Sequence, residues 1–269
     1  MKKLFLSLFL IPLLSYSGNE NYALGGKATG MGNTGLCFSD VWAIRYNQAS
    51  LADISKITAG ISYESRFLTK SLGIQSLAFA LPTNSGTFGL NYTGVGDNLY
   101  RETKLGLGYG MKLAKKFNLG IRINYHQIKL GNNYGTKQNI TFEIGLLTKI
   151  NKNLKLGFHL FNPLNVTLND YQQEIIPVIF NLGINYKFSE KINTNIEIEK
   201  DIDFKPNIKI GIEYKPVKNM FIRTGIETNP MIPSIGFGII YKQFNLDISS
   251  SFHPILGITP TLGITYKVK

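Results

Sequence analysis

The feature that most constrains this chain is an alternation of apolar and polar side chains with a period of two residues, which recurs from about residue 55 to the end. In residues 192–199, isoleucine and threonine occupy the even positions, and asparagine and glutamate occupy the odd positions. Residues 208–215 sort in the same way. A period of two is typical of β-strands, whereas an amphipathic helix repeats every 3.6 residues. The chain after residue 54 is therefore predicted to be all-β.

The number of these runs indicates a closed barrel. We count about 14 strand-like runs, at residues 55–64, 74–81, 86–94, 99–112, 117–130, 138–149, 153–161, 177–187, 191–199, 207–215, 219–227, 234–242, 244–252 and 260–268. An even number of antiparallel strands is typical of single-chain barrels that span the outer membrane with their apolar side chains facing lipid. Residues 55–269 are predicted to form a transmembrane antiparallel β-barrel.

The connections between the runs also favour such a barrel. Short connections that carry lysine or asparagine, such as residues 115–116 and 242–243, alternate with longer ones, such as residues 94–100, 131–137 and 162–176. Outer-membrane barrels have short turns at the periplasmic rim and longer loops at the outer rim. A soluble β-sandwich has no reason to keep this alternation.

Residues 1–17 have the form of a secretory signal peptide. Two lysines precede an apolar run over residues 4–14, and small residues follow at 15–17. The apolar run is too short to span a membrane as a helix. We expect the chain to be exported and to lie in the outer membrane as a multi-pass barrel, with both termini periplasmic after cleavage.

Charge and cysteine usage exclude two classes of protein. The formal net charge is +12, but the lysines are scattered singly instead of gathering in one patch, and an exported protein rarely meets nucleic acid. A nucleic-acid partner is therefore not expected. Cys37 is the only cysteine, so a disulfide framework is excluded. We interpret Cys37 as a small apolar side chain that fills space.

Residues 18–54 do not alternate, and they are predicted to form a plug inside the barrel. Glycines at 25, 26, 30, 32 and 35 permit backbone conformations that other residues avoid, and Asp40 is a candidate N-cap for a short helical turn that ends near Leu51. Glycine also recurs on the polar face of nearly every strand-like run. A barrel of this size has a lumen too wide for its own side chains, so a segment resting on this glycine lining would fill it.

Residues 23–52 resemble the amino-terminal signature of the FadL-like outer-membrane barrels, most closely the PorV/PorQ type associated with type IX secretion. The matching residues include Gly25-Gly26, Gly30-Met31-Gly32, Asp40, Tyr46-Asn47, Ala49 and Leu51-Ala52. The resemblance implies a plug motif formed by Gly30, Gly32, Asp40, Tyr46, Asn47 and Leu51. Gln48 and Ser50 stand where that signature has proline and glycine, and the loss of proline predicts a looser bend there.

The resemblance implies a non-enzymatic accessory subunit that binds other cell-envelope proteins in an export or assembly machine and contacts outer-membrane lipid. The alternative is a FadL-like channel for the uptake of small hydrophobic molecules. Short loops and a polar inner face favour the accessory subunit. The candidate docking surface is the apolar loop over 162–176, with Pro163, Leu164, Tyr171 and Ile175.

The polar faces offer little chemistry for catalysis, so an enzyme, a metal site and a cofactor are not expected. His126, His159 and Glu143 lie on separate runs without a nucleophile motif or a metal-ligand spacing. Charged residues do recur on the inner faces toward the C-terminus. They are predicted to form a lumenal ion network that helps to hold the plug, and its members are Glu197, Glu199, Lys209, Glu213, Arg223, Glu227 and Asp247. A conduction pathway lined by these groups is the alternative.

Overall fold

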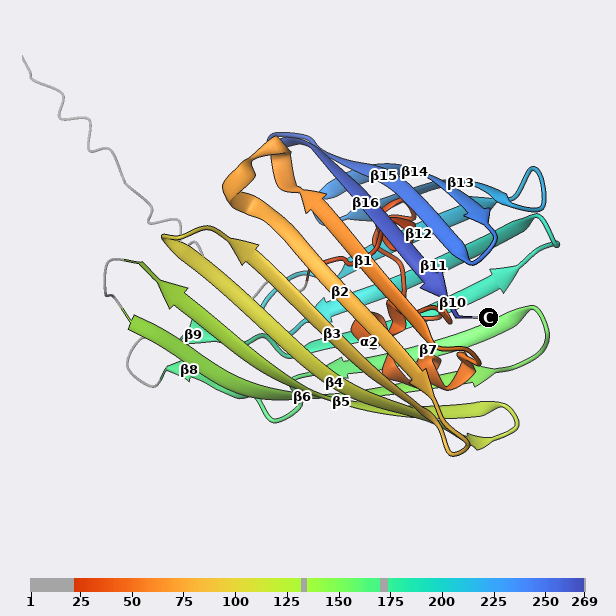
Figure 1. Cartoon of the computed structure of the whole chain (residues 1–269), viewed down its shortest axis with the longest axis horizontal. Helices are drawn as coiled ribbons and strands as arrows, with labels where there is room; N and C mark the ends of the chain where they lie inside the picture. Colours follow the sequence, from red (N-terminus) through yellow and green to blue (C-terminus); the bar gives the residue numbers. More distant parts are fainter. Residues whose placement is uncertain (1–21, 132–134, 170–173, 269) are drawn as a thin grey trace, which may run out of the picture.

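A computed structural model describes residues 22–131, 135–169 and 174–268 as a closed antiparallel β-barrel of 14 strands (Figure 1). The barrel strands are β1 (Thr58–Ser65), β2 (Gly73–Pro82), β3 (Thr87–Gly96), β4 (Tyr100–Ala114), β5 (Phe117–Leu130), β6 (Gly135–Lys149), β7 (Leu154–Phe161), β10 (Ile179–Lys187), β11 (Ile192–Asp201), β12 (Asn207–Tyr214), β13 (Met220–Thr228), β14 (Met231–Tyr241), β15 (Phe244–His253) and β16 (Gly257–Lys267). The predicted fold class and strand number are confirmed.

The strands pair in chain order, and the sheet closes where β1 pairs with β16. The one break in this order is between β7 and β10, which are neighbours because β8 (Thr167–Asn169) and β9 (Glu174–Ile175) form a small sheet of their own in the connection. The sequence predicts an apolar loop over 162–176 in this connection. Its two short strands carry too few residues for an alternation to be recognised.

Exposed apolar side chains cover the outer surface of the barrel. In β10, Phe180, Leu182 and Ile184 point outward with 40%, 57% and 43% of their surface exposed, while Asn181 and Asn185 on the other face are buried. The same pattern recurs around the closed sheet. An apolar surface of this extent is unfavourable in water but favourable against the hydrocarbon of a bilayer. In the described part of the chain, none of the helices has the length and apolar character required to cross a bilayer.

Tyrosines mark one edge of this apolar surface. Tyr186, Tyr214, Tyr241 and Tyr266 lie at the strand ends beside the short turns and are between 39% and 65% exposed. Each precedes a lysine. An amphipathic ring next to a side chain that reaches water is the arrangement that a membrane interface favours. The described chain ends at the same rim (Figure 1).

The expected contrast between short turns and long loops is mostly wrong. Strands β3 and β4 are joined by residues 97–99, β13 and β14 by 229–230, and β15 and β16 by 254–256, so these connections are as short as the turns at the other rim. At the rim where long loops were expected, only the connections at residues 66–72 and 162–178 are long. Strands β4 and β6 continue past the apolar belt with polar side chains on both faces, at residues 101–104 and 136–139. The alternation therefore ends before the backbone pairing does.

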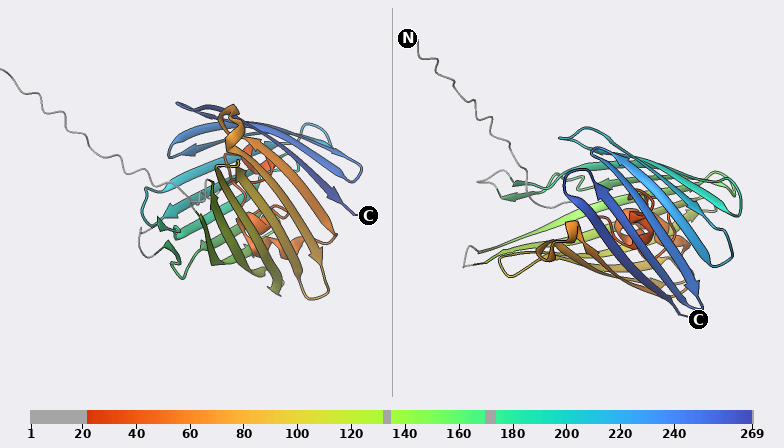
Figure 2. Two further views of the ribbon diagram at one scale, coloured as in Figure 1. Left: turned by 60° about the vertical axis from the view of Figure 1, so that its left-hand side comes forward. Right: turned by 90° about the horizontal axis from the view of Figure 1, so that it is seen from above.

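Residues 22–54, called the N-terminal segment from here on, lie inside the barrel (Figure 2). The segment contains α1 (Gly26–Thr29), α2 (Ala43–Tyr46) and the 3₁₀ helix η1 (Gln48–Asp53). Leu24, Val41, Trp42, Ile44 and Leu51 are buried and pack with Ile74, Ala78, Ala80 and Val95 of the barrel wall. The barrel wall thus has its largest apolar core where it contacts this segment. The predicted signal peptide, residues 1–17, and the first four residues of the predicted plug, 18–21, lie outside the described residues.

Candidate functional site

The N-terminal segment approaches the barrel wall most closely at inward-facing glycines. A side chain on Gly225 of β13 would meet the backbone of Met31 and Gly32, and one on Gly120 of β5 would meet the backbone of Gln48 and Ala49. Gly32 has a φ of +64°, which only glycine adopts readily. Close contacts with the backbone of the segment recur at Gly110, Gly211, Gly236 and Gly263, and close contacts with its side chains occur at Gly60, Gly89, Gly145, Gly157 and Gly183, so that they surround the lumen. Close approach of the N-terminal segment, by its backbone at some positions and by its side chains at others, therefore accounts for most of the glycine lining.

The residues of the predicted plug motif hold the fold of the segment. The Tyr46 hydroxyl accepts a hydrogen bond from the Leu24 amide at 2.8 Å and donates one to the Leu24 carbonyl at 3.0 Å. Asn47 donates to the Leu146 carbonyl of β6 at 3.0 Å and caps η1 by accepting from Ala49 N–H at 3.1 Å. Burial raises the pKa of Tyr46, so its hydroxyl stays a donor at any physiological pH.

The remaining motif residues serve turns and packing. Gly30 follows α1 and lies against Gly236, Gly32 donates its N–H to Ser234 Oγ at 2.9 Å, and Leu51 is fully buried. Asp40 is not the N-cap of a helix that runs to Leu51. Its carboxylate accepts from Trp42 N–H at 3.0 Å, and the helical region divides into α2 and η1 because Asn47 has an extended backbone.

Gln48 takes the place of the signature proline, and it does not loosen the bend. Its side chain is fully buried and donates to the Glu143 carboxylate of β6 at 2.6 Å and to the Ile44 carbonyl at 3.1 Å. Hydrogen bonds of the Gln48 side chain therefore hold the bend that the ring of a proline would otherwise fix. Ser50, which stands in place of glycine, is fully buried beside the Leu36 carbonyl, to which it donates at 3.4 Å.

Glu143 is the centre of a polar cluster on the wall formed by β3, β5, β6 and β7. It accepts hydrogen bonds or ion pairs from Arg122 at 3.2 Å, Asn124 at 2.8 Å and His159 at 2.9 Å, in addition to Gln48. Arg122 also donates to Asn91 at 2.5 Å. Glu143 and His159 stand out in the sequence, but the sequence does not show that Arg122 lies beside them. All these side chains are almost fully buried, so their mutual bonds offset the cost of removing charge from water.

The predicted ion network is divided into smaller groups on the wall formed by β11 to β15. Arg223 pairs with Glu213 at 2.7 Å and with Asp247 at 2.6 Å, and Lys209 pairs with Glu199 at 3.0 Å. Two other members bind the N-terminal segment itself. Glu197 accepts from the Gly35 and Leu36 amides at 2.8 Å each, and Glu227 accepts from the Asn33 side chain.

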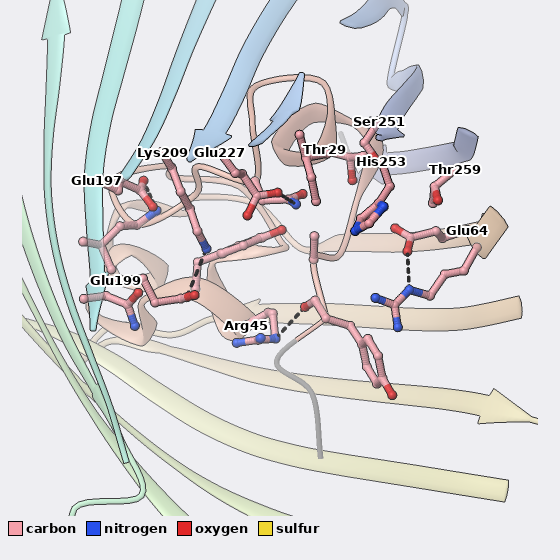
Figure 3. A pocket seen from close by; sticks show the side chains of 18 of the residues that line it. Thr29, Arg45, Glu64, Glu197, Glu199, Lys209, Glu227, Ser251, His253 and Thr259 are labelled. Atoms are coloured by element: carbon pink, nitrogen blue, oxygen red, sulfur yellow. Dashed lines mark hydrogen bonds and ion pairs between the residues drawn. The ribbon is translucent and has the colours of Figure 1, made fainter. Parts of the chain in front are cut away.

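Two cavities lie on opposite sides of the N-terminal segment. One of about 220 Å³ faces the rim with the long connections, and Figure 3 shows Arg45, Glu199, Lys209, Glu227 and His253 around it. The other, of about 460 Å³, lies at the short-turn rim, where its lining includes Asp40, Asp53 and Lys242. A solute that crossed the lumen would have to pass the N-terminal segment between them.

The predicted docking loop is only partly described. Leu164 is 66% exposed and Pro163 is half-buried, whereas Ile176 is buried with Phe161 and Ile179 and cannot belong to an exposed surface. Ile175 lies in β9, and Tyr171 lies outside the described residues. Among the described side chains of this loop, Leu164 is therefore exposed and Ile176 is not.

The thiol of Cys37 and the side chains that could bind a metal ion are the other groups with the chemistry for a site. Cys37 is buried near Gly183, and burial raises the pKa of its thiol, which disfavours the thiolate that a catalytic or redox cysteine needs. Within residues 22–131, 135–169 and 174–268, His, Cys, Asp and Glu side chains form no group of three or more that could hold a metal ion.

Comparisons with known proteins identify the fold. No protein-family model and no curated protein sequence matches this chain. Solved structures do match along nearly its whole length. They include the Ralstonia pickettii toluene transporter TbuX, with 11% identity over 92% of this chain and 99% of that chain and a TM-score of 0.70. A deletion mutant of the TodX monoaromatic hydrocarbon channel matches with 12% identity over 93% and 99% and a TM-score of 0.72. A Pseudomonas aeruginosa FadL homologue matches with 12% identity over 90% and 98% and a TM-score of 0.64. The chain therefore shares the fold of FadL-like barrels.

Proposed function

We propose that this chain is a FadL-like outer-membrane channel for the uptake of small hydrophobic molecules. The observation that carries the proposal is the match of the whole barrel to proteins described as hydrocarbon channels and toluene transporters. The signal-like residues 1–17 and the apolar outer surface support a place in the outer membrane. Because a fold can carry unrelated functions, the lumen must be tested directly.

The arrangement of the lumen supports a gated route across the membrane. The cavities of about 220 Å³ and 460 Å³ lie on either side of the N-terminal segment. The segment is held to the wall by non-covalent contacts, namely apolar packing, hydrogen bonds and close contacts with inward-facing glycines, and no disulfide fixes it because Cys37 is the only cysteine. A shift of the segment would join the two cavities without opening the strand pairing of the barrel.

The sequence-based preference for a PorV/PorQ-like accessory subunit rested on short loops and a polar inner face. The comparisons favour the channel, which was the alternative. The lumen is lined largely by polar side chains, whereas binding pockets for small molecules are mostly apolar. It restricts the proposal to small solutes that cross quickly or that carry a polar group of their own.

An uptake assay tests the channel. Cells that express the protein in an outer membrane lacking other hydrocarbon channels should take up labelled toluene faster than cells with the empty vector. Uptake of a labelled disaccharide should stay at the vector level, because the segment obstructs a wide aqueous path. Equal toluene uptake in both strains, with the protein correctly folded in the membrane, would contradict the proposal.

An interaction subunit stays as a second candidate because apolar side chains are exposed at the tips of the connections on the long-connection rim. Leu68, Leu99, Leu164, Met231 and Ile255 are between 61% and 86% exposed there. Exposed apolar groups of this kind mark partner sites. Affinity purification from detergent-solubilised membranes should then recover envelope proteins. Leu164→Ser combined with Ile255→Ser should lose them, and Leu113→Ser on the lipid-facing surface near the opposite rim should not.

A further inference from the structure

The positive charge of the molecule is concentrated at the short-turn rim, the end of the barrel where the described chain ends (Figure 1). Toward the long-connection rim, cations occur together with anions, and Arg66 pairs with Glu64 at 3.7 Å and Lys104 with Glu102 at 3.2 Å. At the short-turn rim, every connection after the first carries lysine, whereas the acidic residue of these connections is Glu190. Lysines that are scattered along the sequence therefore gather at one rim in the fold.

Many of these lysines point toward the mouth of the lumen and away from the lipid. Tyr186 and Tyr214 are exposed on the outer surface, and Lys187 and Lys215 follow them directly. Successive side chains of a strand point to opposite faces, so both lysines lie on the inner face. Lys155 shares that face, because it is the register partner of the inward-facing Asn185. The rim is thus positive on the side that borders the aqueous lumen.

Two pairs of these lysines lie directly opposite each other across neighbouring strands. Lys149 of β6 is the register partner of Lys155 of β7. Lys215 donates its backbone N–H to the Lys191 carbonyl at 2.8 Å, one position beyond the last register pair of β11 and β12. Like charges in such positions destabilise a sheet. Lys149 is neutralised by Asp53, but in the described ranges Lys155, Lys191 and Lys215 form no ion pair with a carboxylate.

The acidic residues outside the described ranges do not change this balance. They are Glu20 and Asp170. Each is within two residues in sequence of a residue on the side of the long connections, namely Tyr22 beside the cavity of about 220 Å³ and Asn169 of β8. A chain advances by at most about 3.6 Å per residue, which is far less than the length of a barrel strand. A carboxylate partner for the short-turn rim is therefore sought in another molecule.

A pocket of about 300 Å³ lies among these lysines. Its cationic lining consists of Lys152, Lys155, Lys187, Lys191 and Lys215. The two glutamates in its lining are already engaged, because Glu190 pairs with Lys187 at 2.6 Å and Glu213 pairs with Arg223 at 2.7 Å. No residue of the N-terminal segment lines it, so the pocket is separate from the two cavities that adjoin that segment.

We propose that this pocket is a docking site for an acidic peptide segment of a periplasmic protein. The short connections of outer-membrane barrels face the periplasm, so the partner comes from that side. A cleft lined by one sign of charge concentrates groups of the opposite sign, and carboxylates would relieve the repulsion between the paired lysines. The inference goes beyond the proposed channel and does not depend on what the channel carries.

The spacing of the lysines favours a peptide over a lipid headgroup or a small anion. Lipid headgroups lie outside the barrel, at the level of the exposed tyrosines, whereas these lysines face the mouth. They come from β7, β10, β11 and β12 or the turns beside them, which are successive neighbours in the sheet. At about 4.8 Å per strand, the row extends over roughly 14 Å, which one small anion cannot cover. An extended peptide of four to five residues covers about that distance.

The experiment measures binding of three labelled peptides to the full-length protein in a non-ionic detergent. Pentaglutamate carries the proposed charge, pentaglutamine carries none, and pentalysine carries the opposite charge. By fluorescence anisotropy, pentaglutamate should bind at least about tenfold more tightly than the other two, because several charge pairs act together. Its affinity should fall as the ionic strength rises from about 0.1 M to about 1 M, since the Debye length shortens from about 10 Å to about 3 Å. Equal binding of the three peptides would overturn the proposal.

Variants connect the binding to the pocket. Lys191→Gln combined with Lys215→Gln should lower the affinity for pentaglutamate at least about fivefold. The strand pairing should persist, because the two substitutions remove a repulsive pair. Lys112→Gln combined with Lys115→Gln removes the same charge from exposed positions beside another turn of the same rim and should change the affinity less than about twofold. An equal loss in both variants would mean that the rim attracts anions as a whole, and it would overturn the pocket.

Two further comparisons separate the alternatives. Lys70→Gln combined with Lys205→Gln, at exposed positions of the long-connection rim, should leave pentaglutamate binding unchanged, and a loss there would contradict a site at the short-turn rim. Displacement of the labelled peptide by inorganic phosphate or by soluble short-chain phosphatidylglycerol, at a lower concentration than unlabelled pentaglutamate requires, would assign the pocket to a small anion or to a lipid headgroup. Toluene uptake should be the same in all these variants, so failure of the docking site leaves the channel standing.

Discussion

At the scale of single residues, the lumen is organised by side chains that join the N-terminal segment to the wall. Gln48 illustrates this most clearly. The sequence predicted a weaker bend because proline is absent, whereas the structure places the Gln48 amide on a carboxylate that already binds Arg122, Asn124 and His159. The segment and the polar cluster of Glu143 are therefore one hydrogen-bonded unit, and a change in one should be felt in the other.

Gln48→Ala should loosen the N-terminal segment and leave the barrel intact. The substitution removes the hydrogen bond to Glu143 and should cost about 1–3 kcal/mol of the free energy that holds the segment in place. The denaturation midpoint reported by Trp42 fluorescence should fall, while the loss of β-sheet circular dichroism stays unchanged. Gln75→Ala, at an exposed position of β2, is the matched control. Equal midpoints for Gln48→Ala and the unmodified protein would contradict a tether.

The hydrogen bonds of Asp53 predict how the attachment of the N-terminal segment to the barrel wall responds to a fall in pH. Burial would raise the pKa of Asp53, but hydrogen bonds from Lys149 and Asn118 outweigh burial and lower it below its ordinary value of 3.8. The folded state thus holds the charged form more strongly than the unfolded state does. Its stabilising effect is complete well above pH 3.8 and is lost as the pH falls through the folded-state pKa.

The unmodified protein should therefore lose up to about 1 kcal/mol of segment stability between pH 6 and pH 3 that Asp53→Asn does not lose. Guanidinium titrations followed by Trp42 fluorescence at the two pH values measure this difference. Asp203→Asn, in the exposed connection after β11, should behave as the unmodified protein does. An identical pH dependence in Asp53→Asn would show that the pair with Lys149 contributes nothing.

At the scale of elements, the sequence predicts the strands but not which side chains meet across neighbouring strands. Alternation identified all 14 barrel strands because one face meets lipid and the other does not. It could not pair Arg122 with Glu143, since that pair depends on the register between β5 and β6 across the connection at 131–134. A shift of register by two residues would keep every side chain on its face and still separate the two charges.

The same limit applies to the N-terminal segment. Its glycines and the Tyr46-Asn47 pair were visible in the sequence, and the glycine lining of the strands suggested a contact. Which glycine meets which residue required the three-dimensional path of the segment.

Gly225→Ala tests whether the glycine lining positions the segment. The added methyl group would meet the backbone of Met31 and Gly32, which cannot rotate away as a side chain can. Such overpacking should destabilise the docked segment by about 1–3 kcal/mol and raise the frequency of open events in planar bilayers. Gly131→Ala is the control, because its nearest contacts are Asn98 and Leu99 in a connection remote from the segment. Unchanged gating in Gly225→Ala would contradict the close contact.

At the scale of the whole molecule, the question is whether a solute crosses while the segment stays in place or only when it moves. The strand pairing closes completely, and the segment contacts the wall around the whole lumen. Movement of the segment as a unit is therefore the simplest way to connect the two cavities. A covalent lock between segment and wall distinguishes the two cases in the full-length chain.

Gly157→Cys supplies this lock, because a Cβ atom on Gly157 of β7 would lie 3.0 Å from Sγ of Cys37. The Cβ atom of one half-cystine lies about 3 Å from the sulfur of the other, so the new pair is placed to form a disulfide. Toluene uptake should fall to the vector level under oxidising conditions and recover with a reductant, because the lock prevents movement of the segment. Gly157→Ser, which adds a side chain of similar size without a thiol, should show no dependence on redox conditions. Full uptake by a chain shown by mass spectrometry to be oxidised would mean that solutes pass a stationary segment, and the route would then have to be sought between the segment and the wall.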